Sequence, residues 1–490
     1  MSKRLTLERI KRYIDKSEYA KICELADELL TRIQDRNLDI EKVRLLVGFG
    51  GGKDSSWTIS IVRIAQLICF EKTGKTFGLD SITMVHLGMS KHVLENIHKA
   101  YSALDMYNKE NIRLIAYSYG YNNRFDINFT IPERIINLLR EDILTLAHRS
   151  YADARTTFCY TCNFHMINSF LANLTDDTLF FLSGDSEDEL KNYEEWTNFL
   201  FDRLEINSDS SSENNLLNSI HKFLILEEQF YGDVFPEDAK KERLFKKTTA
   251  NISPFISYIN ISEYTRHEMD AHKVFLTKFL KFQFHKESFN FSESDCIHPL
   301  FMAHLRGLSA EINGRSYKDG INDYLKLAKK IMESKKFPSK IIQEMIRRYK
   351  GSKMFYMRKR AAKILKDVLK INENQIICAI YSPFANKGQN LKKYFTEVHP
   401  NYKNLDLVHE VLRRTEIKPD YDEVIKFLEL ISGLNISYLK KIYHSSIVSQ
   451  DNCDGNSGCI LRLIKEKEPH QHQIQYEQNG QKIVETITGR

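Results

Sequence analysis

Short apolar runs alternate with longer stretches of mixed apolar and charged residues between residue 43 and about residue 190. A run of four to eight apolar residues is typical of a buried strand, whereas apolar residues three or four positions apart are typical of a helix. We interpret four runs as strands, which begin at Val43 and then occupy Ser81–Leu87, Asn111–Tyr119 and Thr178–Ser183. Helical segments separate them, and this alternation favours right-handed βαβ units. The pattern therefore predicts an α/β fold with a parallel, doubly wound sheet.

A glycine-rich segment follows the first strand directly and reads Gly50, Gly51, Gly52, Lys53, Asp54, Ser55 and Ser56. Glycines tolerate positive φ angles and let backbone N–H groups approach a ligand. The polar residues that follow are good N-cap residues, so a helix is predicted from about residue 55. Its N-terminus and the lysine both carry positive charge, which suits a polyphosphate. The alternative interpretation is a strand-to-helix turn that binds nothing.

Two common glycine motifs do not fit this segment. A Walker A loop needs four residues between its first Gly and Gly-Lys, and here three separate Gly48 from Gly52. The dinucleotide pattern would place its last glycine on Lys53. The segment instead resembles the S-G-G-x-D-S loop of the PP-loop ATP pyrophosphatases, with Gly50 in place of the first serine. That resemblance implies a HUP-like sheet, ATP bound by residues 50–56, cleavage between the α and β phosphates, and catalytic roles for Lys53 and Asp54.

Two further segments fall at the carboxyl ends of predicted strands, where ligands bind in such sheets. One contains His86 and the other begins at Gly184. A single nucleotide could therefore contact these two segments and the glycine-rich segment together. Acidic residues follow Gly184, and capping of the next helix would explain them. Gly184, Asp188 and Glu189 also resemble the G-H-N-x-D-D motif of tRNA-thiolating PP-loop enzymes. The resemblance implies that Asp188 acts on ATP through Mg²⁺, which usually takes one or two protein carboxylates.

Cys159 and Cys162 form a C-x-x-C pair, which by itself is too small for a zinc site or an iron–sulfur cluster. In the tRNA 2-thiocytidine and 2-thiouridine enzymes a similar pair precedes the acidic motif, and a third cysteine follows later. By that resemblance Cys296 completes a [4Fe–4S] site that carries sulfur. Zinc bound with His165 or His298, and plain buried thiols, are the alternatives. Cys453 and Cys459 frame a predicted flexible loop or, alternatively, a metal or disulfide clip.

The rest of the chain is predicted to be mainly helical. We divide it into a helical extension (1–40), the ATP pyrophosphatase domain (41–300) with an insertion around 205–250, a helical C-terminal domain (301–465) and a flexible tail (466–490). Residues 376–383 interrupt the helical pattern and are predicted to form a strand.

Segment 326–370 contains sixteen Lys or Arg residues and three acidic ones. Four aromatic residues are interleaved with this charge: Phe337, Tyr349, Phe355 and Tyr356. Cations beside aromatic rings can bind a phosphate backbone and stack on bases, so tRNA is a predicted partner. The alternative is a solvated helical face with the aromatic residues in the core.

Composition adds the cellular setting. The chain has a net charge of +6, eight cysteines in 490 residues, and no apolar run of bilayer length. We therefore expect a cytoplasmic protein without a membrane partner and without a disulfide framework. The resemblances above imply ATP-dependent adenylation with pyrophosphate release, followed by sulfur transfer with a sulfur donor protein. Alternatives are an amide-forming or nitrogen-transferring ligase and a non-catalytic nucleotide-sensing protein.

Overall fold

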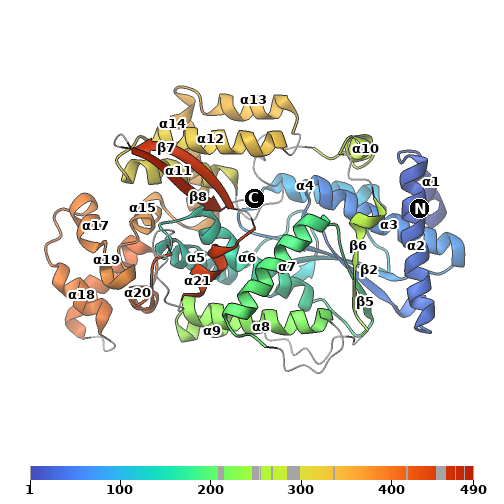
Figure 1. The fold of residues 1–490 in the computed structure, drawn as a ribbon, viewed down its shortest axis with the longest axis horizontal. Helices are drawn as coiled ribbons and strands as arrows, with labels where there is room; N and C mark the ends of the chain where they lie inside the picture. Colours follow the sequence, from blue (N-terminus) through green and yellow to red (C-terminus); the bar gives the residue numbers. More distant parts are fainter. Residues whose placement is uncertain are drawn as a thin grey trace.

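The computed structural model describes most of the chain, namely residues 2–207, 215–244, 253, 255–265, 269–283, 298–334, 337–414, 418–448, 459–469, 471–478 and 481–488. Figure 1 shows a central sheet, with the N-terminal helices at one end of the molecule and helices α17 to α20 at the other. Among the described residues, no helix is both long and apolar enough to cross a membrane.

The central sheet has six strands in the order β4-β3-β2-β1-β5-β6. Its strands are β1 (Arg44–Gly48), β2 (Gly78–Met84), β3 (Ile112–Ser118), β4 (Tyr121–Arg124), β5 (Thr178–Ser183) and β6 (Ser257–Asn260). Every pair is parallel except β3 with β4, which form a hairpin. The predicted α/β fold with a mostly parallel sheet is confirmed. Because β2 and β5 lie on opposite sides of β1, the strand order reverses at β1 and opens a crevice there.

Helices cover both faces of the sheet because successive strand residues point to opposite sides. On one face, Leu45, Val47 and Leu79 pack in a cluster with α1 (Lys3–Lys11), α2 (Lys16–Asp35), α3 (Lys53–Thr73) and α4 (Lys91–Ala103). On the other face, Leu46, Ile82 and Ile115 pack against α6 (Ala154–Leu171) and α8 (Asn215–Val234). The sheet therefore lies between two apolar layers, and the site described below is at its carboxyl edge.

The helical remainder shares one continuous apolar cluster with α5 (Glu133–His148), α6 and α7 (Glu187–Arg203). Its helices are α9 (Glu237–Arg243), α11 (Pro299–Ile312), α12 (Tyr317–Ser334), α13 (Ser339–Arg348), α14 (Lys353–Leu369), α15 (Glu373–Tyr381), α16 (Ala385–Gly388), α17 (Leu391–Val398), α18 (Leu405–Arg413), α19 (Asp422–Ser432), α20 (Ile436–Tyr443) and α21 (Ile460–Glu466). Helix α10 (Met269–Val274) instead leads into Phe275 and Phe279, which pack in the cluster with α1 to α4. In the segment predicted as a loose tail, β7 (Gln471–Gln478) and β8 (Gln481–Thr488) form an antiparallel hairpin.

The strand predicted at 376–383 is wrong, because most of that segment belongs to α15. A reciprocal capping box starts this helix. The backbone N–H of Gln375 donates to Asn372 Oδ1, and the backbone N–H of Asn372 donates to Gln375 Oε1. Ile376, Cys378 and Ile380 are all buried. A short helix that is buried on most sides gives an unbroken apolar run, which its periodicity cannot distinguish from a strand.

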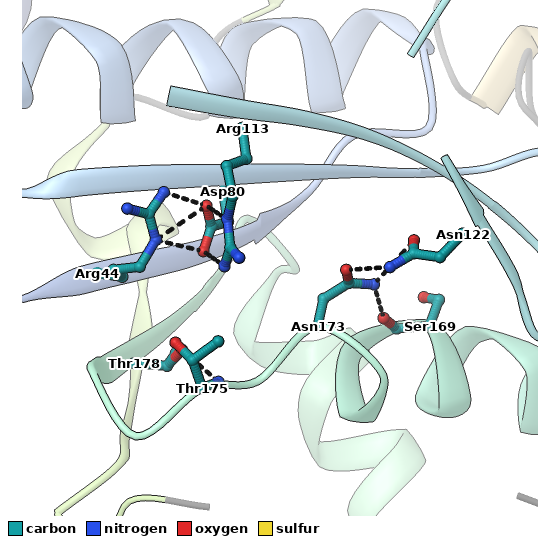
Figure 2. Close-up of polar contacts among 8 residues, drawn as sticks. All are labelled: Arg44, Asp80, Arg113, Asn122, Ser169, Asn173, Thr175 and Thr178. Carbon is teal, nitrogen blue, oxygen red and sulfur yellow. Dashed lines mark hydrogen bonds and ion pairs between the residues drawn. The ribbon is translucent and has the colours of Figure 1, made fainter. Parts of the chain in front are cut away.

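A buried carboxylate joins the three central strands near their amino-terminal ends (Figure 2). Asp80 on β2 is completely buried and accepts hydrogen bonds from Arg44 Nε of β1 at 2.9 Å and Arg113 Nε of β3 at 2.6 Å. Figure 2 also shows Asn122 of β4 donating to Asn173 at 2.7 Å, which ties the edge strand to the segment before β5. The Asp80 contacts fix the sheet toward the end opposite the glycine-rich segment, whereas Asn122 pairs with Tyr117 near the carboxyl end of β3.

Candidate functional site

The glycine-rich segment connects β1 to α3 and is held tightly in place. The Phe49 amide donates to Ile82 O at 2.8 Å, and Thr83 Oγ1 donates to Phe49 O at 3.0 Å. Gly51 has φ +82°, and a Cβ there would lie 2.7 Å from carbon atoms of both Val93 and Ile97 on α4. Gly51 is thus required by its backbone conformation and by the close approach of α4.

The N-terminus of α3 has no side-chain cap. Gly52 occupies the N-cap position and makes no side-chain capping bond, while Ser55 Oγ and Ser56 Oγ donate to Gly52 O at 3.2 and 2.7 Å. Because the serine oxygens point at the carbonyl, the first N–H groups of this 21-residue helix are open to an anion. Ser56 is fully buried, so its role here is to hold the loop.

Lys53 and Asp54 form an ion pair at the mouth of the segment. Lys53 Nζ lies 2.6 Å from Asp54 Oδ1, and the exposed fractions of the two side chains are 12% and 81%. The lysine is thus sheltered beside the helix N-terminus while its partner faces solvent. A bound polyphosphate would replace Asp54 as the anion that neutralises Lys53.

The segment after β5 packs against α3. A Cβ on Gly184 would lie 2.2 Å from Thr58 Oγ1, so only glycine allows this contact. Helix α7 follows, with the Glu189 amide donating to the N-cap oxygen of Ser186 at 3.2 Å. Asp188 lies exposed in the first turn of α7. Its carboxylate suits the helix dipole, and its helix starts beside the first turns of α3.

A half-buried thiol and a buried imidazole lie at the carboxyl end of β2. His86 Nδ1 is 3.8 Å from Cys162 Sγ, whose thiol donates to Phe158 O at 2.9 Å. Burial lowers the pKa of His86 to about 4, so its ring is neutral at physiological pH. The Nε2 atom of His86 has no hydrogen-bond partner among the described residues.

His165 lies one turn further along α6 and faces the same region. Its ring centroid is 3.5 Å from that of Tyr119, which follows β3. Burial, and to a lesser extent the neighbouring His86, lowers the pKa of His165 well below its ordinary value. His165 Nε2 and Tyr119 Oη are buried without a hydrogen-bond partner in the part of the chain that the structure describes. Such groups are rare in native proteins and usually indicate a ligand or ordered water. We call His86, Tyr119, Cys162 and His165 the thiol–imidazole cluster.

The predicted metal ligands are not brought together in the described structure. Cys159 is buried in the apolar cluster, Cys162 lies beside His86, and Cys296 is outside the described residues. The Nδ1 atom of His298 accepts the Leu300 amide at 3.2 Å and caps α11. No group of three or more His, Cys, Asp or Glu side chains within the described ranges is arranged to hold a metal ion.

The described residues contain two of the three thiols that a cubane cluster needs, and no chemical step below is assigned to iron–sulfur or zinc. The other predicted pair is also separate from this region. Cys453 lies outside the described residues, and Cys459 Sγ accepts a hydrogen bond from Arg149 at 3.2 Å.

Glu227 is a buried acid that no sequence pattern singles out. It lies on α8, and its carboxylate accepts Asn168 Nδ2 of α6 at 2.6 Å. Burial raises the pKa of Glu227 to about 8. Asn168 follows Cys162 and His165 at three-residue spacing, so all three face one side of α6. Glu227 therefore extends the polar region beneath the sheet, and it is protonated at neutral pH.

Replacing Glu227 with glutamine is expected to stabilise the protein by about 3 kcal/mol at pH 7. Glutamine resembles the protonated acid and keeps the acceptor for Asn168. Because the folded-state pKa exceeds the ordinary value of 4.5, the stability that Glu227 contributes is complete below pH 4.5 and is lost as the pH rises to about 8. Urea unfolding of both proteins across this pH range should give curves that meet at low pH and separate above it.

The adjacent Glu228 provides the control. Its side chain is 64% exposed and lies 3.3 Å from Lys240. Glu228→Gln should change the free energy of unfolding by less than about 1 kcal/mol at every pH. A Glu227→Gln protein that is less stable than the parent at pH 8 would contradict the assignment of a neutral Glu227.

Comparisons with protein-family models, with curated proteins and with solved structures found no match to this chain. Function must therefore be argued from the geometry at the carboxyl edge of the sheet.

Proposed function

We propose that the protein is a PP-loop ATP pyrophosphatase that adenylates a substrate oxygen and releases pyrophosphate. The observation that carries this proposal is the tight segment Gly50–Gly52, which leads into the uncapped N-terminus of α3 with Lys53 beside it. Backbone N–H groups, a helix dipole and a lysine converge there, which is the chemistry that binds phosphate groups.

The position of the segment in the sheet supports a nucleotide ligand. Counted along the chain, the five parallel strands have the order third, second, first, fourth, fifth. This order matches the first five strands of doubly wound nucleotide-binding sheets, whose ligands lie where the strand order reverses. The segment follows β1, which is the strand at that reversal.

In the proposed reaction the substrate oxygen attacks the α-phosphorus of ATP, and the bond to the β-phosphate oxygen breaks. Lys53 neutralises the leaving pyrophosphate. Asp188 is the proposed carboxylate that would hold a magnesium ion, which would supply further positive charge there when bound. Asp54 is the proposed second catalytic residue of the loop. The thiol–imidazole cluster lies at the end of β2 next to the segment, so we place the acceptor substrate on that side.

Sulfur transfer is the proposed second step, in which a sulfur nucleophile displaces AMP from the activated carbon. The contact between Cys162 and His86 favours it, because it places a thiol and an imidazole together on the side where the substrate is proposed to lie. By the resemblance to tRNA-thiolating enzymes, the acceptor is a tRNA base and a separate protein supplies sulfur. An amide-forming ligase is the second candidate, because it needs the same ATP site but no metal.

Lys53→Ala is expected to slow pyrophosphate release from Mg·ATP about 100-fold, because it removes one charged group from the leaving pyrophosphate. The assay would supply fractionated cell extract as the source of acceptor, and calorimetry would measure ATP affinity without it. Lys72→Ala is the matched control, since Lys72 lies at the other end of α3 and pairs with Asp27.

Unchanged ATP affinity and turnover in Lys53→Ala would remove the assignment of the glycine-rich segment. Tight ATP binding by the parent protein, with no pyrophosphate released in any fraction, would instead favour the nucleotide-sensing interpretation.

A further inference from the structure

The exposed face of α14 differs from an ordinary solvated helix face. Its buried side consists of Met357, Ala361, Leu365 and Leu369, spaced four residues apart. On other sides of the helix, Phe355 and Tyr356 are 63% and 64% exposed. Figure 1 shows α14 grouped with α11, α12 and α13, away from the strands of the central sheet. Two adjacent aromatic rings are therefore presented to solvent on a helix whose apolar side is already packed.

The structure separates the four aromatic residues of the basic segment into two pairs. Phe337 and Tyr349 are 7% and 4% exposed and belong to the apolar core. Phe355 and Tyr356 are left on the surface. Packing in the core therefore explains Phe337 and Tyr349, but it does not explain Phe355 and Tyr356.

Basic side chains surround the exposed pair. Residues 350–370 contain eight Lys or Arg residues and one acid, Asp367. Arg358 does not contribute to this surface charge, because it bonds Glu311 at 2.8 Å and Glu373 at 3.1 Å. Lys363 pairs with Asp367 at 2.5 Å. A positive excess is left along the helix, and it includes the exposed residues Lys350, Lys353, Lys359, Lys366 and Lys370.

The aromatic rings and the charges share one stripe. Lys359 Nζ lies 4.6 Å from the ring centroid of Phe355, one helical turn away. Lys366 continues the same side at helical spacing, and Lys370 follows at the C-cap of α14, so the stripe is about 20 Å long. We call Phe355, Tyr356, Lys359, Lys366 and Lys370 the α14 stripe.

We propose that the α14 stripe binds a single-stranded polynucleotide. Exposed aromatic rings stack on unpaired bases, which every nucleotide offers, and the lysines neutralise the phosphates beside those bases. A duplex keeps its bases stacked on each other and cannot use the rings. The inference rests on α14 alone and not on the proposed ATP chemistry, although an RNA acceptor would connect the two.

Fluorescence anisotropy with labelled 20-nucleotide strands tests the proposal, using unstructured RNA, the matching DNA and a blunt RNA duplex. Phe355→Ala with Tyr356→Ala should weaken single-strand binding about 10- to 100-fold and leave its salt dependence nearly unchanged. Lys359→Glu with Lys366→Glu should also weaken binding and lower the slope of log affinity against log salt by about 0.7 for each phosphate that is no longer neutralised.

Matched controls come from other exposed helices. Leu430→Ala removes an apolar side chain that is 70% exposed on α19, and Lys392→Ala removes an exposed lysine on α17. Both should bind like the parent chain. All substituted side chains are exposed, and circular dichroism would check that each variant is folded.

The proposal is supported if the parent binds single-stranded RNA or DNA and both stripe variants bind it more weakly. The strand that the parent binds more tightly then identifies the ligand as RNA or DNA. Equal binding by the aromatic variant and the parent, tighter binding of the duplex, or no binding by the parent would overturn it. Lys53→Ala should leave strand binding intact, so failure at the ATP site and failure at the α14 stripe give different results.

Discussion

Asp80→Ala is expected to lower the free energy of unfolding by about 3–5 kcal/mol. Asp80 is completely buried, and its carboxylate pairs with Arg44 on β1 and Arg113 on β3. Alanine would leave the guanidinium groups of Arg44 and Arg113, on the two strands that flank β2, without the carboxylate that lies between them. Removing one member of a buried ionic group costs more folding free energy than the complete group contributes, because the remaining charges are left without a counter-charge. Urea unfolding at pH 7 would measure the change.

Two companion variants separate charge from other effects. Asp80→Asn keeps the side-chain volume and one acceptor, so its cost should come mainly from the lost charge and be smaller. Asp27→Ala removes the exposed partner of Lys72 and should cost less than about 1 kcal/mol. A loss below about 1 kcal/mol in Asp80→Ala would show that the arginines find other partners. Because Asp80 lies at the opposite end of the strands from Gly51, the folded variant should bind ATP normally.

Local pattern was enough to predict the strands that carry long apolar runs. The predicted bounds of β1, β3 and β5 agree with the observed ones within one or two residues, because in these strands the apolar run ends where the strand ends. The second strand was placed at Ser81–Leu87, whereas β2 is Gly78–Met84. The shift arises because Val85 and His86 are buried after the ladder ends, so the apolar signal continues into the loop. β4 has four exposed residues and therefore no apolar face to detect.

Contacts between distant residues could not be predicted from local pattern. The position of Asp80 beside Arg113 depends on the register of β2 and β3, and Glu227 meets Asn168 only because α8 packs on α6. The glycine-rich segment and His86 were found because strand ends are visible in the sequence. Tyr119 was missed as a site residue because an aromatic side chain after an apolar strand more often belongs to the core. Its ring contact with His165 becomes visible only when α6 is placed on the sheet.

Gly51→Ala is expected to reduce ATP affinity and pyrophosphate release about 100- to 1000-fold. Two costs combine at this position. A side chain at φ +82° costs about 1–2 kcal/mol, and a methyl group placed 2.7 Å from Val93 and Ile97 adds about 1–3 kcal/mol of overpacking. The loop can avoid both costs by moving away from α4, but that movement would displace the N–H groups that are proposed to hold the phosphates. Each 1.4 kcal/mol lost from the bound state corresponds to a tenfold loss of affinity.

Gly74→Ala is the control that makes this result interpretable. Gly74 ends α3 with φ +76°, and a Cβ there would meet no atom within 4 Å. The Gly74→Ala variant therefore has the free-energy cost of the positive φ angle without the overpacking. It lies at the opposite end of α3 from the proposed phosphate site. Gly74→Ala should lose about 1–2 kcal/mol of stability and keep its ATP affinity. Adding Val93→Ala to Gly51→Ala should restore part of the binding, because it removes one of the two contacts. If both glycine variants bound ATP like the parent, the close approach of the loop to α4 would have no part in nucleotide binding, and the phosphate site would have to be sought elsewhere at the carboxyl edge of the sheet.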